Sequence, residues 1–297
     1  MSNKILVASM QINNGFSGQY YLPYSIGLLC SYLKKHSNKL NDLKFTIPIY
    51  RREEKSELVK KIEEVDILLV SLYVWNKNIS LAVVKELKIK NPDLLVIIGG
   101  PSVPNDASEF MITHNYIDIC VHQEGEQTVL EIVDMFPNNN YRDIQGLSFR
   151  DDNGIIHNTG IRDRIRDFSL IPSPYLSGFF DELIEIVGDS HSWLASWESN
   201  RGCPFAYTYC DWGSATNSKV TRIELEQAFE ELDWFALHKI EFIFVCDANF
   251  GMLPRDLEIA DYVTTLKQVF GYPKVFSVQN TMDIRLLKIQ REALLLI

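Results

Sequence analysis

The sequence lacks the features that mark several large classes of protein. No apolar run in its 297 residues approaches the ~20 residues that a membrane span needs, and no signal-peptide pattern is present. The five cysteines follow no framework spacing, which argues against a disulfide-stapled secreted scaffold and favours a reducing compartment. Basic residues number 29 against 39 acidic ones, and the net charge of −10 disfavours nonspecific binding to nucleic acid. We therefore expect a cytoplasmic globular protein with neither a membrane nor a nucleic acid as partner.

A dinucleotide fingerprint is also missing, because no Gly-x-Gly-x-x-Gly follows the first apolar segment. What is present is a regular alternation of apolar runs and helical patterns over residues 1–136. The runs that predict strands are Lys4–Met10, Phe45–Tyr50, Asp66–Val74, Leu94–Ile98 and Ile117–Val121. This alternation predicts an α/β domain with a doubly wound, Rossmann-like parallel sheet, whose ligand lies outside the carboxyl ends of the strands.

The predicted strand ends carry the candidates for a cofactor site, since glycine there lets the backbone approach a bulky ligand. Gly99-Gly100-Pro101 and Gly125-Glu126 resemble elements of the cobalamin-binding domain that precedes the barrel in one class of radical S-adenosylmethionine (radical SAM) enzymes. That resemblance implies a set of cobalamin contacts at these strand ends. They are Tyr73, Trp75, Asn76, Gly99, Gly100, Ser102, Glu124, Gly125 and Glu126.

The first half departs from one cobalamin motif. Domains that donate a cobalt ligand carry Asp-x-His-x-x-Gly after the first strand, and this string is absent. His114 and His122 lie elsewhere in the sequence. Cobalamin is therefore expected to bind without a protein histidine on cobalt, and the alternative is a Rossmann-like domain that keeps its fold without the ligand.

A change of pattern at Pro137-Asn138-Asn139-Asn140 marks a domain boundary, so residues 137–190 are predicted to link two domains. Within this segment, two short apolar runs flank Asp151-Asp152-Asn153-Gly154, and Asn-Gly at such a turn indicates a β-hairpin. Further on, the prolines of Ile171-Pro172-Ser173-Pro174-Tyr175 fix φ and remove backbone donors. We expect a hairpin followed by a linker that positions one domain over the other.

A second alternation of strands and helices occupies residues 191–297 and predicts part of a (β/α) barrel. The strands are expected at Trp193–Glu198, Ile240–Val245 and Lys274–Gln279, with helical patterns between them. In a barrel, the carboxyl ends of the strands carry the site. Asp247 and Asn249 follow one predicted strand, and capping of that strand end is the alternative to a role in binding.

The stretch from Arg201 to Gly213 holds two of the five cysteines, Cys203 and Cys210. It resembles the Cys-x3-Cys-x2-Cys loop that binds a 4Fe-4S cluster in radical SAM enzymes, through Arg-Gly-Cys-Pro-Phe before it and Cys-Asp-Trp-Gly after it. The resemblance implies that both cysteines bind the cluster. It also implies a set of S-adenosylmethionine contacts, namely Phe205, Tyr209, Trp212, Asp247, Asn249, Gln279 and Asn280.

The middle cysteine of this motif is replaced by Tyr207. A phenol has a pKa near ~10, and its oxygen is a harder donor than the iron of a sulfide-rich cluster prefers. Cluster affinity is therefore expected to fall or vanish. Cys246, at the predicted end of a strand near the same mouth, is the one candidate replacement in this half.

Two functions follow from the resemblance. The first is a cobalamin-dependent radical SAM enzyme, in which a reduced cluster cleaves S-adenosylmethionine, the resulting radical activates an unknown small-molecule or peptide substrate, and methylcobalamin supplies a methyl group. The second is an inactive truncated remnant, because Tyr207 weakens the cluster and only about three barrel units follow Trp193. The last predicted strand would then present an open edge through which copies of the chain could self-associate.

Overall fold

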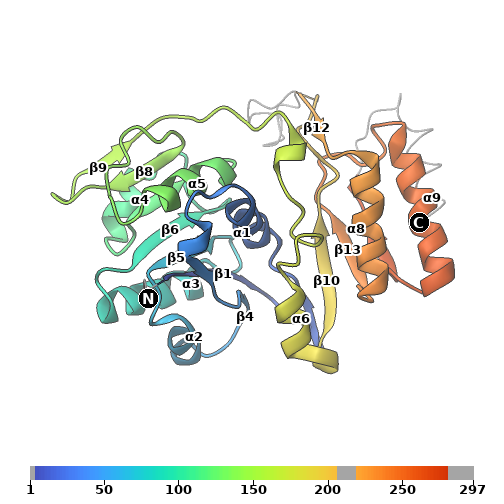
Figure 1. The fold of residues 1–297 in the computed structure, drawn as a ribbon, viewed down its shortest axis with the longest axis horizontal. Coiled ribbons are helices and arrows are strands. Elements are labelled where there is room, and N and C mark those ends of the chain that lie inside the picture. The colour runs from blue at the N-terminus through green and yellow to red at the C-terminus, as the bar shows by residue number, and fades with distance from the viewer. Residues whose placement is uncertain (1–3, 206–218, 280–297) are drawn as a thin grey trace.

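The protein is built on two mainly parallel sheets that lie side by side, and the computed structural model describes residues 4–205 and 219–279 (Figure 1). The first sheet runs in the order β3-β1-β5-β6-β7-β8-β9, with β4 also paired to β1. Its strands are β1 (Ile5–Asn13), β3 (Leu43–Phe45), β4 (Ile49–Arg51), β5 (Ile67–Ser71), β6 (Leu95–Gly99), β7 (Ile119–Val121), β8 (Leu147–Arg150) and β9 (Ile156–Asn158). The pairs from β3 to β7 are parallel, and strand order reverses at β1, which is the flavodoxin-like doubly wound arrangement.

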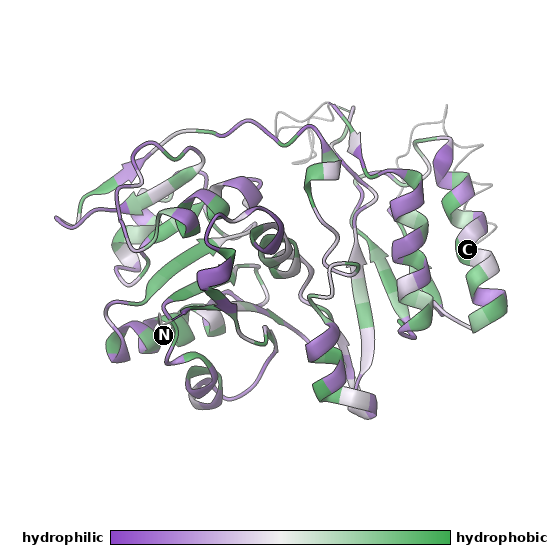
Figure 2. Ribbon diagram, in the orientation of Figure 1, coloured by the Kyte–Doolittle hydropathy of each residue, from purple (hydrophilic) through white to green (hydrophobic). Residues whose placement is uncertain are grey.

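Helices cover both faces of this sheet. On one face lie α2 (Lys55–Ile62), α3 (Lys77–Lys90) and α4 (Ser108–Thr113), which share one hydrophobic core with the strands. On the other face lie α1 (Tyr24–His36) and α5 (Glu126–Met135). The core beneath α1 and α5 continues into the second sheet, so a single hydrophobic core joins the two halves. Figure 2 shows that the central strands of the first sheet are mainly hydrophobic, whereas the helices carry both hydrophobic and hydrophilic residues.

The second sheet has four strands in the order β14-β13-β10-β2, and all neighbours are parallel. Its strands are β2 (Gln19–Tyr21), β10 (Ser192–Trp197), β13 (Phe242–Val245) and β14 (Val275–Ser277), and its helices are α8 (Leu225–Leu237) and α9 (Arg255–Phe270). The strands predicted from Trp193 onward are thus parallel, and the predicted partial barrel is confirmed. The remaining elements are α6 (Asp181–Val187), β11 (Asn200–Arg201), β12 (Thr221–Arg222), η1 (Leu40–Asp42), η2 (Phe168–Leu170) and η3 (Gly188–Ser190).

Two segments cross the domain boundary expected from the sequence. Residues 19–21, which follow β1 in the first predicted domain, form β2, which pairs with β10 of the second sheet. The predicted hairpin is present as β8 and β9, yet it extends the first sheet because β8 pairs antiparallel with β7. Each sheet therefore contains a strand from outside its own predicted domain, and this corrects the simple division at residue 136.

The linker segment is packed into the molecule. Gly27 of α1 allows this packing, because a Cβ there would lie 2.6 Å from the Phe180 ring and 2.9 Å from Pro174. Tyr175 is 1% exposed and stacks on Tyr24 of α1 with ring centroids 5.8 Å apart. The proline-containing stretch is consequently part of the core that joins the sheets.

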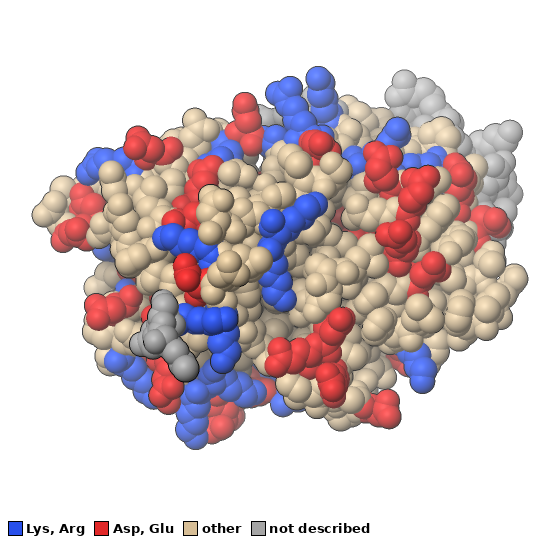
Figure 3. Space-filling model, in the orientation of Figure 1, with Lys and Arg blue, Asp and Glu red and all other residues tan. Residues whose placement is uncertain are grey.

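Many charged residues of the sequence lie on the surface of the molecule. Acidic and basic side chains are interspersed on the face that Figure 3 shows. Within residues 4–205 and 219–279, no helix combines the length and the apolar character needed to cross a membrane.

Candidate functional site

A cavity of about 740 Å³ lies between the carboxyl ends of the first sheet and the second sheet. The first half contributes the start of α1, the ends of β5, β6 and β7, and the turn into α5. The second half contributes Glu198, Arg201 and Gly202 after β10, Phe244 and Cys246 at β13, and Gln279 after β14. This size falls in the range of roughly 300–1,000 Å³ that is typical of small-molecule and cofactor sites. The predicted location, at the strand ends, therefore coincides with a real cavity.

Most of the predicted cobalamin contacts line this cavity. They are Tyr73, Gly99, Gly100, Glu124, Gly125 and Glu126. Gly99 lies at the end of β6, and a Cβ at this position would come no closer than 3.7 Å to its neighbours. A Cβ at position 99 would thus fit without a clash, but a longer side chain would extend into the space of the cavity.

Three predicted contacts do not line the cavity. Asn76 is fully buried: its Oδ1 accepts from the Tyr73 amide at 2.8 Å, and its Nδ2 donates to the Ile12 and Ser71 carbonyls at 3.1 Å each. Trp75 is 44% exposed and stacks on Tyr73 at 4.5 Å, and Ser102 donates its amide to the Leu72 carbonyl. Asn76 therefore holds the backbone of Tyr73, and Trp75 packs on its ring; a direct contact of Trp75 or Ser102 with cobalamin stays a prediction.

No histidine lines the cavity in the described part of the chain. His114 hydrogen-bonds Tyr116 at 2.9 Å, and His122 hydrogen-bonds Ser148 at 2.9 Å on the neighbouring strand. Burial lowers the pKa of both imidazoles, so both favour the neutral form. Cobalamin binding without a protein histidine on cobalt stays a prediction.

Arg201 connects the second half to the first across the cavity. Its side chain is 12% exposed and lies 2.8 Å from Glu126, 3.0 Å from Glu198 and 3.8 Å from Glu124. The guanidinium also lies 5.1 Å from the centre of the Phe168 ring. Burial alone would lower the pKa of Arg201, but the surrounding carboxylates outweigh it and raise that pKa, so Arg201 stays charged.

Cys203 follows Arg201 by two residues and is 6% exposed. The Asn249 side-chain amide donates to the Cys203 sulfur at 3.2 Å, and Asn249 is 6% exposed. Hydrogen bonds to sulfur ligands hold and tune iron–sulfur centres. The Cys203 thiol donates to the Phe205 carbonyl at 3.7 Å. The loop thus brings the first motif cysteine against Asn249, which we place in the sulfur's surroundings.

Asp247 has a different position from the one expected. It is 1% exposed, and its carboxylate accepts from the Ser199 amide at 2.7 Å and hydroxyl at 2.5 Å. It also accepts from the Asn200 amide at 3.0 Å and side-chain nitrogen at 2.7 Å. Burial raises the pKa of Asp247 to about 7, against the opposing effect of these donors. Because both oxygens are used inside the protein, Asp247 positions the loop that leads to Cys203, which corrects the expected contact with S-adenosylmethionine.

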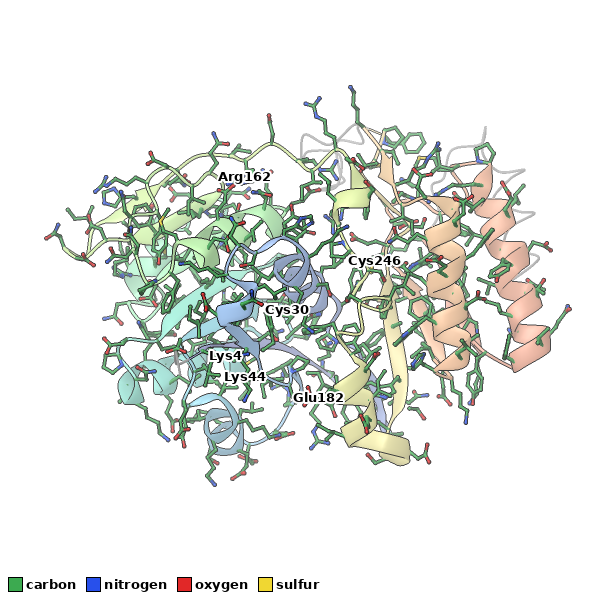
Figure 4. All side chains as sticks on the ribbon, viewed as in Figure 1. Lys4, Cys30, Lys44, Arg162, Glu182 and Cys246 are labelled. Carbon is green, nitrogen blue, oxygen red and sulfur yellow. The ribbon has the colours of Figure 1, made fainter. Side chains whose placement is uncertain are left out.

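Cys246 lies on the second sheet and lines the cavity (Figure 4). Its thiol donates to the Phe244 carbonyl at 3.7 Å, and burial raises its pKa to about 12, so the thiolate is scarce. Among the described residues, no group of three or more histidine, cysteine or acidic side chains is placed to hold a metal ion. Because Tyr207 and Cys210 are not among those residues, Cys246 as a replacement ligand stays a prediction. Tyr207, Tyr209, Cys210, Trp212 and Asn280 lie outside the described residues.

Several cavity residues were missed from the sequence. Tyr24 donates to Glu198 at 3.4 Å, and the Arg164 guanidinium lies 2.9 Å from Glu124. Arg201 was predicted to belong to the cysteine motif but not to line the cavity. Only Glu198 and Arg201 carry a sequence signal, since both are charged residues at or after the end of a predicted strand, and the sequence does not reveal which distant residues pair with them.

Together, the fold and the cavity define a two-part site, in which a doubly wound sheet faces a parallel βα sheet that carries a cysteine loop. Comparisons with known proteins specify the class. The family model of the B12 binding domain matches residues 11–133. The chain is 35% identical over 267 residues to a 2-(S-pantetheinyl)-carbapenam-3-carboxylate methyltransferase of Streptantibioticus cattleyicolor, covering 89% of this chain and 39% of that protein. It is also 35% identical over 263 residues to the cobalamin-dependent radical SAM methyltransferase TokK of Streptomyces tokunonensis, covering 88% of this chain and 38% of TokK.

Solved structures agree at the level of the fold. The cobalamin-dependent S-adenosylmethionine radical enzyme OxsB, with aqua-cobalamin and S-adenosylmethionine bound, superposes with a TM-score of 0.70 at 18% identity, covering 98% of this chain and 42% of that one. TsrM from Kitasatospora setae gives a TM-score of 0.65 at 14% identity, covering 97% of this chain and 57% of that one. The chain spans about two fifths of the length of the curated relatives named above, at 39% and 38%. Residues 11–133 thus match the B12 binding domain, and the chain as a whole is similar to part of cobalamin-dependent radical SAM methyltransferases.

Proposed function

We propose that this protein acts in cobalamin-dependent radical SAM methyl transfer to a small-molecule substrate, either free or attached to a carrier. The observation that carries the proposal is the shared cavity of about 740 Å³, which the strand ends of the B12-type sheet and the cysteine-loop sheet line together. The two similar curated proteins are a methyltransferase named for a pantetheinyl-carbapenam carboxylate and the methyltransferase TokK, which supports a small-molecule substrate. An inactive remnant that keeps the cavity is the alternative, and Tyr207 favours it.

The cavity residues fit cobalamin. Leu69, Ile97 and Val121 from three neighbouring strands provide an apolar floor to the cavity, which suits the apolar face of a macrocycle. Gly99 leaves room beside them, and no described histidine is available to the cobalt. Bound cobalamin would supply the methyl group, and a cluster with S-adenosylmethionine would supply the radical that activates the substrate.

Asp247 and Asn249 hold the segment that leads to Cys203 in the second half of the cavity. Asp247 fixes Ser199 and Asn200 at the start of the cysteine loop through buried hydrogen bonds. Asn249 donates to the Cys203 sulfur and so would stabilise a negatively charged thiolate there. The contacts of Phe205 and Gln279 with S-adenosylmethionine stay part of the proposal, supported for Gln279 by its place in the cavity wall.

Production in the presence of hydroxocobalamin, followed by measurement of cobalamin per chain, tests this function. Gly99→Leu should abolish retention because its side chain would take space in the cavity that the cofactor needs, whereas the matched Gly99→Ala, whose Cβ meets only ordinary contacts at 3.7 Å, should retain cobalamin. Equal retention by both variants would place cobalamin elsewhere. Iron per chain after anaerobic reconstitution would then separate the active proposal from the inactive remnant, which should bind cobalamin without a cluster.

A further inference from the structure

The charged side chains that line the cavity leave it with an excess of negative charge. Within the described part of the chain they are Glu124, Glu126, Glu198, Arg164 and Arg201, so three carboxylates face two guanidinium groups. Like charges repel more strongly where water is excluded than they do in bulk water. A ligand that brings further negative charge into the cavity is therefore disfavoured.

Glu124 already has a donor on each of its oxygens. Its Oε1 accepts from Arg164 Nε at 2.9 Å, and its Oε2 accepts from the Ile165 amide at 3.0 Å. Glu124 is thus held by the linker segment, and neither of its oxygens is left without a donor.

Glu126 and Glu198 each keep one oxygen without a partner. Arg201 lies 2.8 Å from Oε1 of Glu126, and it donates to Oε2 of Glu198 at 3.0 Å. Tyr24 donates to the same oxygen of Glu198 at 3.4 Å. Among the described residues, Oε2 of Glu126 and Oε1 of Glu198 have no hydrogen-bond or ion-pair partner. Glu126 is only 4% exposed, and a buried carboxylate oxygen without a donor is unfavourable, so a ligand that donates hydrogen bonds completes this wall.

The positive groups of the same wall are already engaged. Arg201 is shared among the three glutamates, and Arg164 donates to Glu124. The first turn of a helix also favours an anion, because the helix dipole is positive there. Glu126 is the first residue of α5, so its own carboxylate occupies that position. A carboxylate on a ligand would have to compete with these glutamates for both arginines.

The side chains of a corrin ring are amides in cobalamin and carboxylates in corrinoids that have not been amidated. An amide has both N–H donors and a carbonyl acceptor, whereas a carboxylate only accepts. We propose that Glu126 and Glu198 make the cavity selective for amidated corrinoids, because they accept hydrogen bonds from the corrin amides and repel carboxylates. This inference rests on the proposed function, since it takes the occupant of the cavity to be a corrinoid.

Two corrinoids that differ only in these groups test the selectivity. Cobyric acid carries primary amides on its corrin side chains, and cobyrinic acid carries a carboxylate in place of each. Their Kd values should be measured near neutral pH from the corrinoid absorption spectrum, in about 1 M salt, where a Debye length of about 3 Å screens the net charge of the whole protein. The wild type should bind cobyric acid about 100-fold more tightly than cobyrinic acid, since each of the two glutamates contributes about 10-fold.

Glu126→Gln and Glu198→Gln each replace a carboxylate by an amide of the same shape, so each should lower this ratio by about 10-fold. If one of the two variants does not fold, the other carries the test. Glu131→Gln is the matched control, because Glu131 also lies on α5 and also pairs with an arginine, Arg162, but does not line the cavity. It should keep the ratio of the wild type.

Equal Kd values for the two corrinoids in the wild type would overturn the selectivity, and so would a ratio that Glu126→Gln and Glu198→Gln leave unchanged. Failure of cobyric acid to bind where hydroxocobalamin binds would overturn it as well, because the wall would then not recognise the corrin amides. Failure of hydroxocobalamin to bind to both the wild type and Glu131→Gln would instead overturn the proposed function.

Discussion

Replacement of Tyr175 should destabilise both halves of the molecule together. Its ring is 1% exposed and packs edge-on against Phe235 of α8 at 4.6 Å as well as on Tyr24 of α1. Tyr175→Ala removes a buried aromatic side chain, which costs about 3–5 kcal/mol of unfolding free energy. Tyr175→Phe removes only the hydroxyl that donates to the Ser196 carbonyl at 2.5 Å, and it should cost about 1 kcal/mol.

Equilibrium unfolding in urea, followed by tryptophan fluorescence and by far-UV circular dichroism, measures these losses. Leu176→Ala is the control next in sequence, because Leu176 is 40% exposed and its truncation should change stability by less than about 0.5 kcal/mol. Since Tyr24 also lines the cavity, Tyr175→Ala should weaken cobalamin binding as well. A loss below about 1 kcal/mol for Tyr175→Ala would refute the reasoning, because a side chain in the core that joins the two sheets cannot be truncated so cheaply.

The other predictions concern protonation, the cysteine motif and the domain boundary. Because burial raises the pKa of Asp247 from 3.8 to about 7, the folded protein holds a proton that the unfolded chain releases, and this contribution to stability is lost as the pH rises through about 7. Urea unfolding of the wild type and of Asp247→Asn should be measured from about pH 4 to about pH 8. The unfolding free energy of the wild type minus that of the variant should fall as the pH rises, and a constant difference would contradict the reasoning. Tyr207→Cys restores the three-thiolate pattern and should raise iron per chain after reconstitution, whereas equal, high iron in both proteins would show that the original motif is sufficient. A chain of residues 1–136 leaves β2 without β10, so it should lack the cooperative urea transition that residues 1–279 show.

The sequence predicted those features that depend on local periodicity. Buried parallel strands appear as apolar runs, and a doubly wound sheet places its ligand at their carboxyl ends, so Gly99 and Glu126 could be assigned to the cavity before the structure was known. The parallel second sheet was predicted from the same alternation of apolar runs and helical patterns.

The features that the sequence could not predict depend on distant partners. β2 has three residues, and its pairing with β10 joins Tyr20 to Trp193, far along the chain, with no local pattern to announce it. Asp247 and Asn76 were expected at the ligand because both are polar and follow strands. In the structure both side chains are buried, and a buried polar group needs hydrogen-bond partners. Both side chains form these hydrogen bonds with other residues of the protein.

Electron paramagnetic resonance of the reduced Co(II) corrinoid tests the central claim most directly, namely that the shared cavity binds the cofactor without a protein ligand on cobalt. Cobinamide, which lacks the nucleotide base, should be used so that any axial nitrogen on cobalt, beyond the four of the corrin ring, comes from the protein. The account predicts that cobinamide binds to the wild type and not to Gly99→Leu, with a cobalt signal free of nitrogen splitting. Nitrogen splitting that disappears in His122→Ala or His114→Ala, or binding that survives Gly99→Leu, would contradict it.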